Sequence, residues 1–196
     1  MFGLPHSFGE NVQPCITASG EYCDAWDIMS AMNAFSYPDS FQGVHGNFGP
    51  GLNTFNLKAL GGLPGDCEFV IDKPDFSDTF DLAPLNQPPQ TGGRYAIEIH
   101  RPGASIYTIE YRHKAGWDRA LPYDAVLVHE EKSGRLFLKH TVDNSPLLAG
   151  QHYATPVPRV YVEVSSIDFY AQKATVRVWT CRSMHCGRRT PTRTTI

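Results

Sequence analysis

The stretch Tyr107-Thr108-Ile109-Glu110-Tyr111-Arg112 decides the fold class of this chain. Bulky apolar residues at positions 107, 109 and 111 alternate with more polar residues at 108, 110 and 112, which is the period of a β-strand. The same alternation recurs in residues 95–100, 160–164 and 174–179. Strands of this kind place one face on a core and the other in water. Their spacing predicts an antiparallel β-sandwich over residues 65–180.

A more continuously apolar run, residues 124–129, has a different place in the predicted sandwich. A run without polar alternation suits a strand that is covered on both faces, so we expect it to be a central strand. Histidines occupy strand or strand-end positions at irregular spacing, and we expect most of them to face solvent. They are His100, His113, His129 and His140.

The region before the predicted sandwich follows another pattern. Residues 1–50 are rich in glycine and proline and predict an irregular, loop-built segment. Residues 52–60 predict a helix that ends at Gly61-Gly62, with an apolar face formed by Leu52, Phe55, Leu57, Ala59 and Leu60. The change of pattern places a boundary after Pro64. The expected fold class is therefore mainly β with a small α/loop segment over residues 1–64.

Charge and composition exclude some function classes. The chain carries 17 basic and 20 acidic residues, and four of the arginines lie in the last fifteen residues, which hold no acid. The remainder is acidic, which argues against nucleic-acid binding. We expect residues 181–196 to form a flexible basic tail. No apolar run reaches the roughly 18 residues that a membrane-spanning helix needs, so we expect no membrane span.

Other side chains leave alternatives open. Trp117 and the tyrosines of residues 107–111 could form a platform for a sugar or a peptide, although we expect them to be buried in the sandwich. The sparse aspartates of residues 66–81 allow a calcium site but lack the spacing of a calcium loop. Cys15 and Cys23 could form a disulfide in a secreted protein, or both could be unbonded buried thiols.

Two short segments carry a resemblance to a known family. Gly3, Pro5 and His6 are followed downstream by the turn Trp26-Asp27-Ile28-Met29-Ser30. This order resembles the second half of the metzincin zinc-peptidase motif, HExxHxxGxxH followed by a methionine-bearing turn. The resemblance extends to gametolysin-like and immune-inhibitor-A-like peptidases through the run after Gly51 and through the β-region from about residue 95.

The resemblance implies roles for two residues of this chain. His6 would be the third zinc ligand, and Met29 would pack beneath the metal-binding histidines, although a lone methionine is more often simply a core residue. His45 is a further candidate ligand or proton donor, and the alternative is an exposed loop histidine. The HExxH half, with the other ligands and the general-base glutamate, is missing. No catalytic residue can therefore be named.

The resemblance also implies a function and a location. Residues 1–64 would be a truncated remnant of a secreted, extracellular zinc endopeptidase that acts on peptide or protein substrates. Translated as given, without a signal peptide, the chain would be cytoplasmic. It would be inactive in this form and would bind zinc, the cofactor of the parent family, only weakly. The alternative is a non-catalytic β-sandwich that binds an extracellular protein or a glycan.

Overall fold

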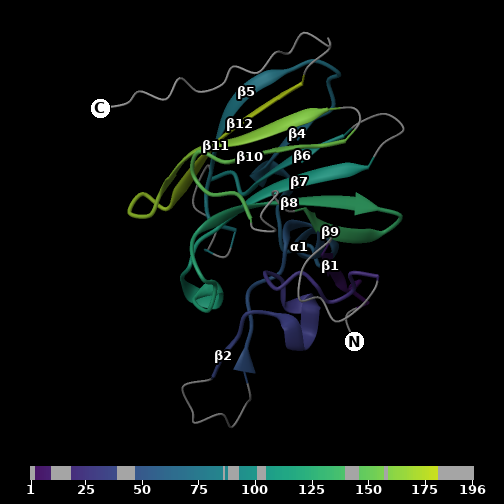
Figure 1. Cartoon of the computed structure of the whole chain (residues 1–196), viewed down its shortest axis with the longest axis vertical. Coiled ribbons are helices and arrows are strands. Elements are labelled where there is room, and N and C mark those ends of the chain that lie inside the picture. The colour runs from purple at the N-terminus through teal and green to yellow at the C-terminus, as the bar shows by residue number, and fades with distance from the viewer. Residues whose placement is uncertain are drawn as a thin grey trace.

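The computed structural model describes residues 3–9, 19–38, 47–85, 87, 93–100, 105–139, 146–156 and 159–180. Within these residues the chain is mainly β, with two larger sheets that pack face to face and a small two-stranded sheet at one end (Figure 1). The mainly β part of the predicted fold class is thus confirmed, whereas the two sheets include a strand from before residue 65 and are not antiparallel throughout. The basic tail, residues 181–196, lies outside the described residues and stays a prediction.

The larger sheet has six strands in the order β1-β9-β8-β7-β6-β4. Its inner pairs are antiparallel, whereas the two edge pairs, β1 with β9 and β4 with β6, are parallel. The predicted central strand is β8, which pairs with β7 on one side and β9 on the other. The strands are β1 (Ser7–Gly9), β4 (Glu68–Ile71), β6 (Ala96–Ile99), β7 (Ile106–Arg112), β8 (Ala125–Lys132) and β9 (Arg135–Lys139).

The second sheet is antiparallel throughout and has the order β10-β11-β12-β5. Its strands are β5 (Ser77–Leu82), β10 (His152–Ala154), β11 (Val160–Asp168) and β12 (Lys173–Thr180). A shift of register between Val164 and Ser166 marks a bulge in the pairing of β11 with β12. The small sheet pairs β2 (Tyr37–Pro38) with β3 (Asn47–Phe48).

The apolar core lies between the two larger sheets. The six-stranded sheet contributes the residues at 97, 99, 107, 109, 111, 126 and 128, and the four-stranded sheet contributes those at 82, 160, 162, 164, 174, 176 and 178. These are the inward positions of the period-two pattern. Burial of this many aliphatic and aromatic side chains is the main stabilising contribution to the sandwich.

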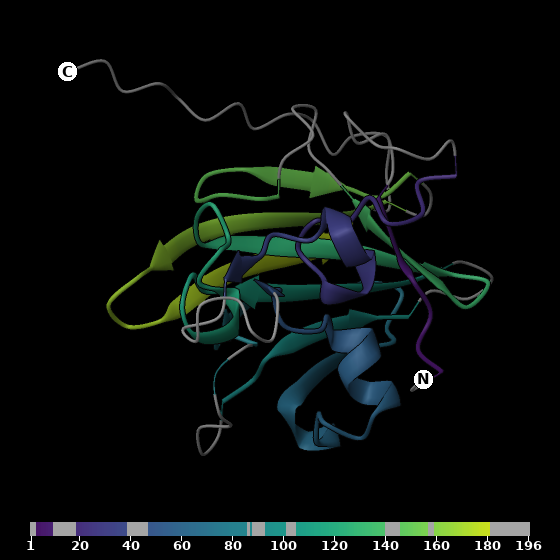
Figure 2. The same ribbon diagram turned by 90° about the horizontal axis from the view of Figure 1, so that it is seen from below.

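The opposite face of the six-stranded sheet does not face water, contrary to the sequence expectation. Glu98, Thr108, Glu110, Arg112 and His129 are all buried. The segment before residue 64 covers this face, and Figure 2 shows η1 (Ile28–Asn33) and α1 (Thr54–Ala59), in purple and blue, in front of the strands. A second, smaller apolar cluster gathers there around Trp26, with Leu121, Ala125, Leu127 and Leu138.

Helix α1 confirms the predicted helix but turns a different face inward. Asn53 caps it by accepting a hydrogen bond from the backbone N–H of Asn56 at 2.8 Å. The side chains of Asn53, Thr54 and Asn56 are buried, whereas Ala59, on the predicted apolar face, is exposed. The helix packs by its polar face because the sheet beneath it carries buried charges. Three-residue 3₁₀ turns, η2 (Gly65–Cys67) and η3 (Gly116–Asp118), complete the described helical elements.

The sheet extends across the boundary that the sequence pattern places after Pro64. Strand β1, from the N-terminal segment, pairs with β9, and Thr54 of α1 binds Glu110 of β7. The sequence pattern changes after Pro64, but hydrogen bonds join the residues before this point to the strands that follow it. No helix in the described part of the chain is long and apolar enough to cross a membrane.

Candidate functional site

His6, the predicted zinc ligand, lies exposed just before β1, and both of its ring nitrogens are engaged. Nδ1 lies 2.6 Å from Glu21 Oε1, and Nε2 lies 3.0 Å from the hydroxyl oxygen of Tyr22. The Tyr22 ring packs at 4.4 Å between centroids, and its backbone takes a positive φ of 62°. Left-handed backbone is unfavourable for a bulky residue, so the fold holds Tyr22 against the imidazole at a cost.

The groups around His6 do not fit a zinc site by themselves. Zinc sites in proteins use three or four nitrogen, sulfur or carboxylate ligands. Among the described residues no group of three histidines, cysteines, aspartates or glutamates is placed to hold a metal ion. We therefore derive no hydrolytic step from these residues. His45 lies outside the described part of the chain.

Met29, the other residue that the family resemblance singles out, is half-buried in η1. Its backbone N–H donates to Asp27 Oδ1 at 2.6 Å. The nearby Cys23 is disulfide-bonded, and Cys67 is a free thiol. Cys15 lies outside the described residues, so its predicted pairing with Cys23 stays a prediction.

Two of the four histidines expected in solvent are buried instead. His113 Nδ1 lies 2.7 Å from Asp124 Oδ2, and His129 Nε2 lies 3.0 Å from Asp24 Oδ2. The alternation of residues along the strands did not predict the burial of these two histidines, because it shows periodicity and not which segments of the chain cover a strand. His140 lies outside the described residues.

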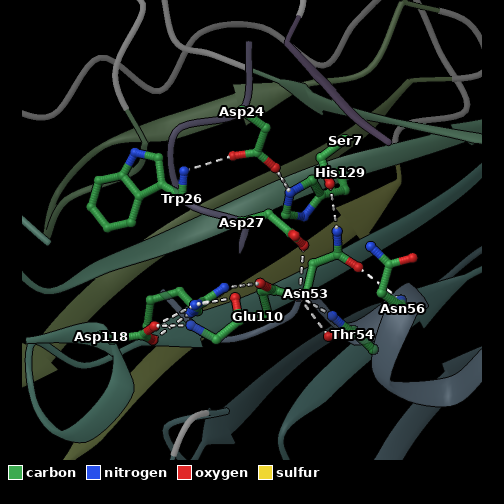
Figure 3. Close-up of polar contacts among 12 residues, drawn as sticks. Ser7, Asp24, Trp26, Asp27, Asn53, Thr54, Asn56, Glu110, Asp118 and His129 are labelled. Carbon is green, nitrogen blue, oxygen red and sulfur yellow. Dashed lines mark hydrogen bonds and ion pairs between the residues drawn. The ribbon is translucent and has the colours of Figure 1, made fainter. Parts of the chain in front are cut away.

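His129 belongs to a buried group of charged and polar side chains between the N-terminal segment and β7 and β8, which we call the polar network (Figure 3). Asp24 accepts from His129 and from the backbone N–H of Trp26 at 3.0 Å. The members of the polar network are Asp24, Asp27, Asn53, Thr54, Glu110, Arg112, Asp118 and His129.

Asp27 links the 3₁₀ helix η1 to the start of α1. Its second carboxylate oxygen accepts from the backbone N–H of Asn53 at 2.8 Å. Burial and the nearby negative charge of Asp24 raise the pKa of Asp27 to about 6. Burial by itself lowers the pKa of His129, but the hydrogen bond to Asp24 and the surrounding carboxylates outweigh it and raise that pKa above its usual value.

Arg112 forms the other end of the polar network. Its guanidinium donates in bidentate fashion to Asp118, with Nε at 2.6 Å from Oδ2, and Nη1 lies 3.3 Å from Glu110 Oε1. Glu110 Oε2 in turn accepts from the backbone N–H of Thr54 at 2.8 Å and from its hydroxyl at 2.6 Å. All four side chains are fully buried. The arrangement neutralises two of the buried carboxylates with one guanidinium.

An apolar cleft of about 680 Å³ adjoins the polar network at Gly51, which lines the cleft and binds Asp118. Its walls include the segment Gly49-Pro50-Gly51 and the side chains of Ile28, Phe48, Leu57, Leu85, Tyr95 and Trp117. The Trp117 side chain is 58% exposed, contrary to the expected burial, and meets Phe48 edge-on with ring centroids 5.8 Å apart. By contrast, Tyr107 and Tyr111 are buried as expected.

The polar network holds the walls of this cleft in place. Gly51 donates its N–H to Asp118 Oδ1 at 2.8 Å, and its carbonyl accepts from Arg112 Nη2 at 3.0 Å. Asp118 directly follows Trp117, so the ion pair with Arg112 holds the backbone beside Trp117 and, through Gly51, the segment that also lines the cleft. Glu110 fixes α1, which carries Leu57. The cleft is therefore preformed by buried, directional contacts.

Comparisons of the chain with models of known families, with curated proteins and with solved structures find no match.

Proposed function

We propose that this chain is a non-catalytic binding module whose apolar cleft takes an apolar side chain from an extended segment of another protein. The observation that carries the proposal is Trp117, a half-exposed indole in the wall of a preformed concave site. Ligand sites are concave, largely apolar and supplied with a few polar groups. Exposed tryptophan in such a position is a typical anchor for binding energy.

The lining favours a peptide over a glycan. Asn47 and Gln87 carry the polar amide side chains of the lining, whereas most of the wall is aliphatic or aromatic. A sugar would need partners for many hydroxyl groups, and hydroxyls left unpaired on burial cost free energy. An apolar peptide side chain has no such requirement.

Strand β3 supports an extended peptide in particular. Asn47 and Phe48 line the cleft, and in the described residues β3 pairs with β2 alone. We propose that an added strand pairs with the other edge of this two-residue strand, which no other described strand occupies. In this mode of recognition the backbone gives affinity and a pocket for alternate side chains gives specificity.

Selection of phage-displayed random peptides on the full chain tests this proposal. We expect enrichment of peptides that carry a leucine or an aromatic residue. Trp117→Ala should weaken binding of a synthetic selected peptide about tenfold or more, because a large buried contact is lost. Val70→Ala, at an exposed residue outside the cleft, is the control and should bind as the wild type does. Equal binding by Trp117→Ala, or enrichment on an oligosaccharide panel in place of peptides, would overturn the proposal.

A second candidate is descent from a secreted zinc endopeptidase of the metzincin type. Strand β1, which follows His6, and η1, which contains Met29, lie against each other, so the two residues belong to neighbouring elements as the resemblance requires. The disulfide at Cys23 supports an oxidising, extracellular location. A protein extended at its N-terminus by a family-like His-Glu-x-x-His helix and its supporting sheet should retain zinc through dialysis. If His6→Ala leaves that zinc bound, His6 is not a ligand and this candidate fails.

A further inference from the structure

The apolar cleft has no charged side chain among the described residues that line it. Any preference for a charged partner must therefore come from groups beside the cleft. Lys58 follows the lining residue Leu57, but its ammonium group is already paired with Glu68 and Glu98. Lys58 is thus neutralised within the chain.

Arg119 lies beside the wall that Trp117 and Phe48 form. It follows Trp117 by two residues, and its guanidinium carbon lies 3.7 Å from the ring centroid of Tyr37. Tyr37 is the cross-strand partner of Phe48, with ring centroids 5.8 Å apart, and Phe48 lines the cleft. The guanidinium is therefore one aromatic ring removed from the cleft wall.

The contact with Tyr37 leaves the N–H donors of Arg119 available. At 3.7 Å the guanidinium carbon is in van der Waals contact with the ring, so the plane of the group lies over the ring face, since an edge-on group would keep its carbon farther away. The donors lie in that plane and point outward. Arg119 is exposed, and no carboxylate of the described residues pairs with it.

The backbone that carries Arg119 is also fixed. The preceding residue, Asp118, is buried in its ion pair with Arg112. Its N–H donates to the Ala115 carbonyl at 2.9 Å, and its carbonyl accepts from the N–H of Leu121 at 2.9 Å. The guanidinium is thus held at both ends, by the buried ion pair and by the Tyr37 ring, and less conformational entropy is lost when it binds a ligand.

We propose that the extended segment bound at the apolar cleft carries an aspartate or glutamate two or three residues from its apolar anchor, and that this carboxylate pairs with Arg119. An extended chain advances about 3.3 Å per residue, so this spacing spans about 7–10 Å. That reach crosses the Tyr37 ring, as its contacts of 3.7 Å with Arg119 and 5.8 Å with Phe48 require. The planar guanidinium suits bidentate binding of a carboxylate.

Another charged group limits where the carboxylate can lie. Asp66 is exposed in η2, two residues after Pro64, which also lines the cleft. A carboxylate beside Pro64 would meet like charge, whereas one beside Tyr37 meets Arg119. The inference rests on the proposed function, because it names the partner of the same cleft.

Sequencing and titration of the phage-selected peptides test the inference. Aspartate or glutamate should be over-represented two or three positions from the apolar anchor. A synthetic selected peptide with glutamate there should bind the full chain about two- to fivefold more tightly than its copy with glutamine, the range of a solvent-exposed ion pair. The difference should shrink as salt is added.

Two variants assign the preference to one residue. Arg119→Gln should bind the glutamate and glutamine peptides equally, because the positive charge is removed. Lys114→Gln is the matched control and should keep the preference for glutamate. Lys114 is an exposed basic residue of the same loop, and its Nζ donates to the Pro122 carbonyl at 3.1 Å.

The outcomes separate this inference from the proposed function. If Trp117→Ala weakens both peptides but the wild type shows no preference for glutamate, the inference is overturned and the proposed function stands. A preference that persists in Arg119→Gln, or that disappears equally in Lys114→Gln, also overturns the inference. If Trp117→Ala binds both peptides as the wild type does, the proposed function fails and the inference fails with it.

Discussion

The two faces of β7 are buried by different means. Tyr107, Ile109 and Tyr111 face the four-stranded sheet and contribute to the apolar core. Thr108, Glu110 and Arg112 face the N-terminal segment, where hydrogen bonds and ion pairs replace apolar contact. Apolar contacts tolerate substitution in proportion to the volume lost. A buried charge pair does not, since the loss of one partner leaves the other without compensation.

The largest expected effect follows from Arg112, which compensates Asp118 and Glu110 on the polar face. Arg112→Ala should lower the free energy of unfolding by about 3–5 kcal/mol, the usual cost of breaking a fully buried pair. Urea denaturation followed by circular dichroism measures this loss. The substitution should also open the cleft, because Gly51 and Asp118 lose their common partner.

Lys173→Ala is the matched control for Arg112→Ala. Lys173 Nζ lies 3.0 Å from Asp81 Oδ2, and both side chains are about half exposed. An exposed pair contributes at most about 1 kcal/mol. If the two substitutions have equal effects, the polar face is not a compensated buried network and the comparison of the two faces fails.

A change of pH should have an intermediate effect on the free energy of unfolding, because the pKa of Asp27 is raised in the folded chain. A carboxyl group whose pKa is higher in the folded than in the unfolded state favours folding when protonated. Its contribution is complete below about pH 4 and is lost as the pH rises through about 6. A shift of one pKa unit corresponds to about 1.4 kcal/mol, so the stabilisation that is lost as Asp27 ionises amounts to about 3 kcal/mol. The raised pKa of His129 acts in the same direction, since its stabilisation is also lost as the pH rises.

Denaturation of the wild type and of Asp27→Asn across the range from about pH 4 to about pH 8 checks this expectation. With rising pH in that range, the wild type should lose stability relative to Asp27→Asn, because only the wild type carries the Asp27 carboxyl group. The carboxylate of Asp24 and the guanidinium of Arg112 also act on Asp27, which is why the slope and not the absolute stability is compared. Equal slopes for the wild type and Asp27→Asn would contradict the assignment, since carboxylates with lowered pKa values, such as Glu98, act in the opposite direction in both proteins.

The smallest expected effects come from two buried threonines, Thr54 of α1 and Thr108 of β7. The Thr54 hydroxyl donates to Glu110 at 2.6 Å, whereas Thr108 Oγ1 is buried without a hydrogen-bond partner in the described structure. Thr54→Val should cost about 1.5–3 kcal/mol, because it removes a hydrogen bond to a charged group. Thr108→Val should be neutral or slightly stabilising. Thermal melts of both variants test these two expectations. A larger loss of stability for Thr108→Val than for Thr54→Val would show that the Thr108 hydroxyl has a hydrogen-bond partner.

Sequence pattern predicted much of the fold and little of the candidate site. Period-two alternation located β6, β7, β11 and β12, and the apolar run at 124–129 located the central strand β8. It did not predict the parallel edge pairs, since alternation carries no information on strand direction. It also did not predict that α1 packs by its polar face, because an apolar stripe indicates the buried side only when the surface beneath it is apolar.

By itself, the sequence determined where β6, β7, β8, β11 and β12 lie and which side of the alternating strands among them meets the apolar core. Both follow from local periodicity and burial of apolar area. Tertiary structure alone decided that Glu110, Arg112 and His129 are buried, that Trp117 is exposed above them, and that a cleft lies between. Charged residues on a strand look the same in sequence whether water or another segment covers them. Their burial depends on contacts between residues far apart in the chain, such as Asp24 with His129 and Gly51 with Asp118.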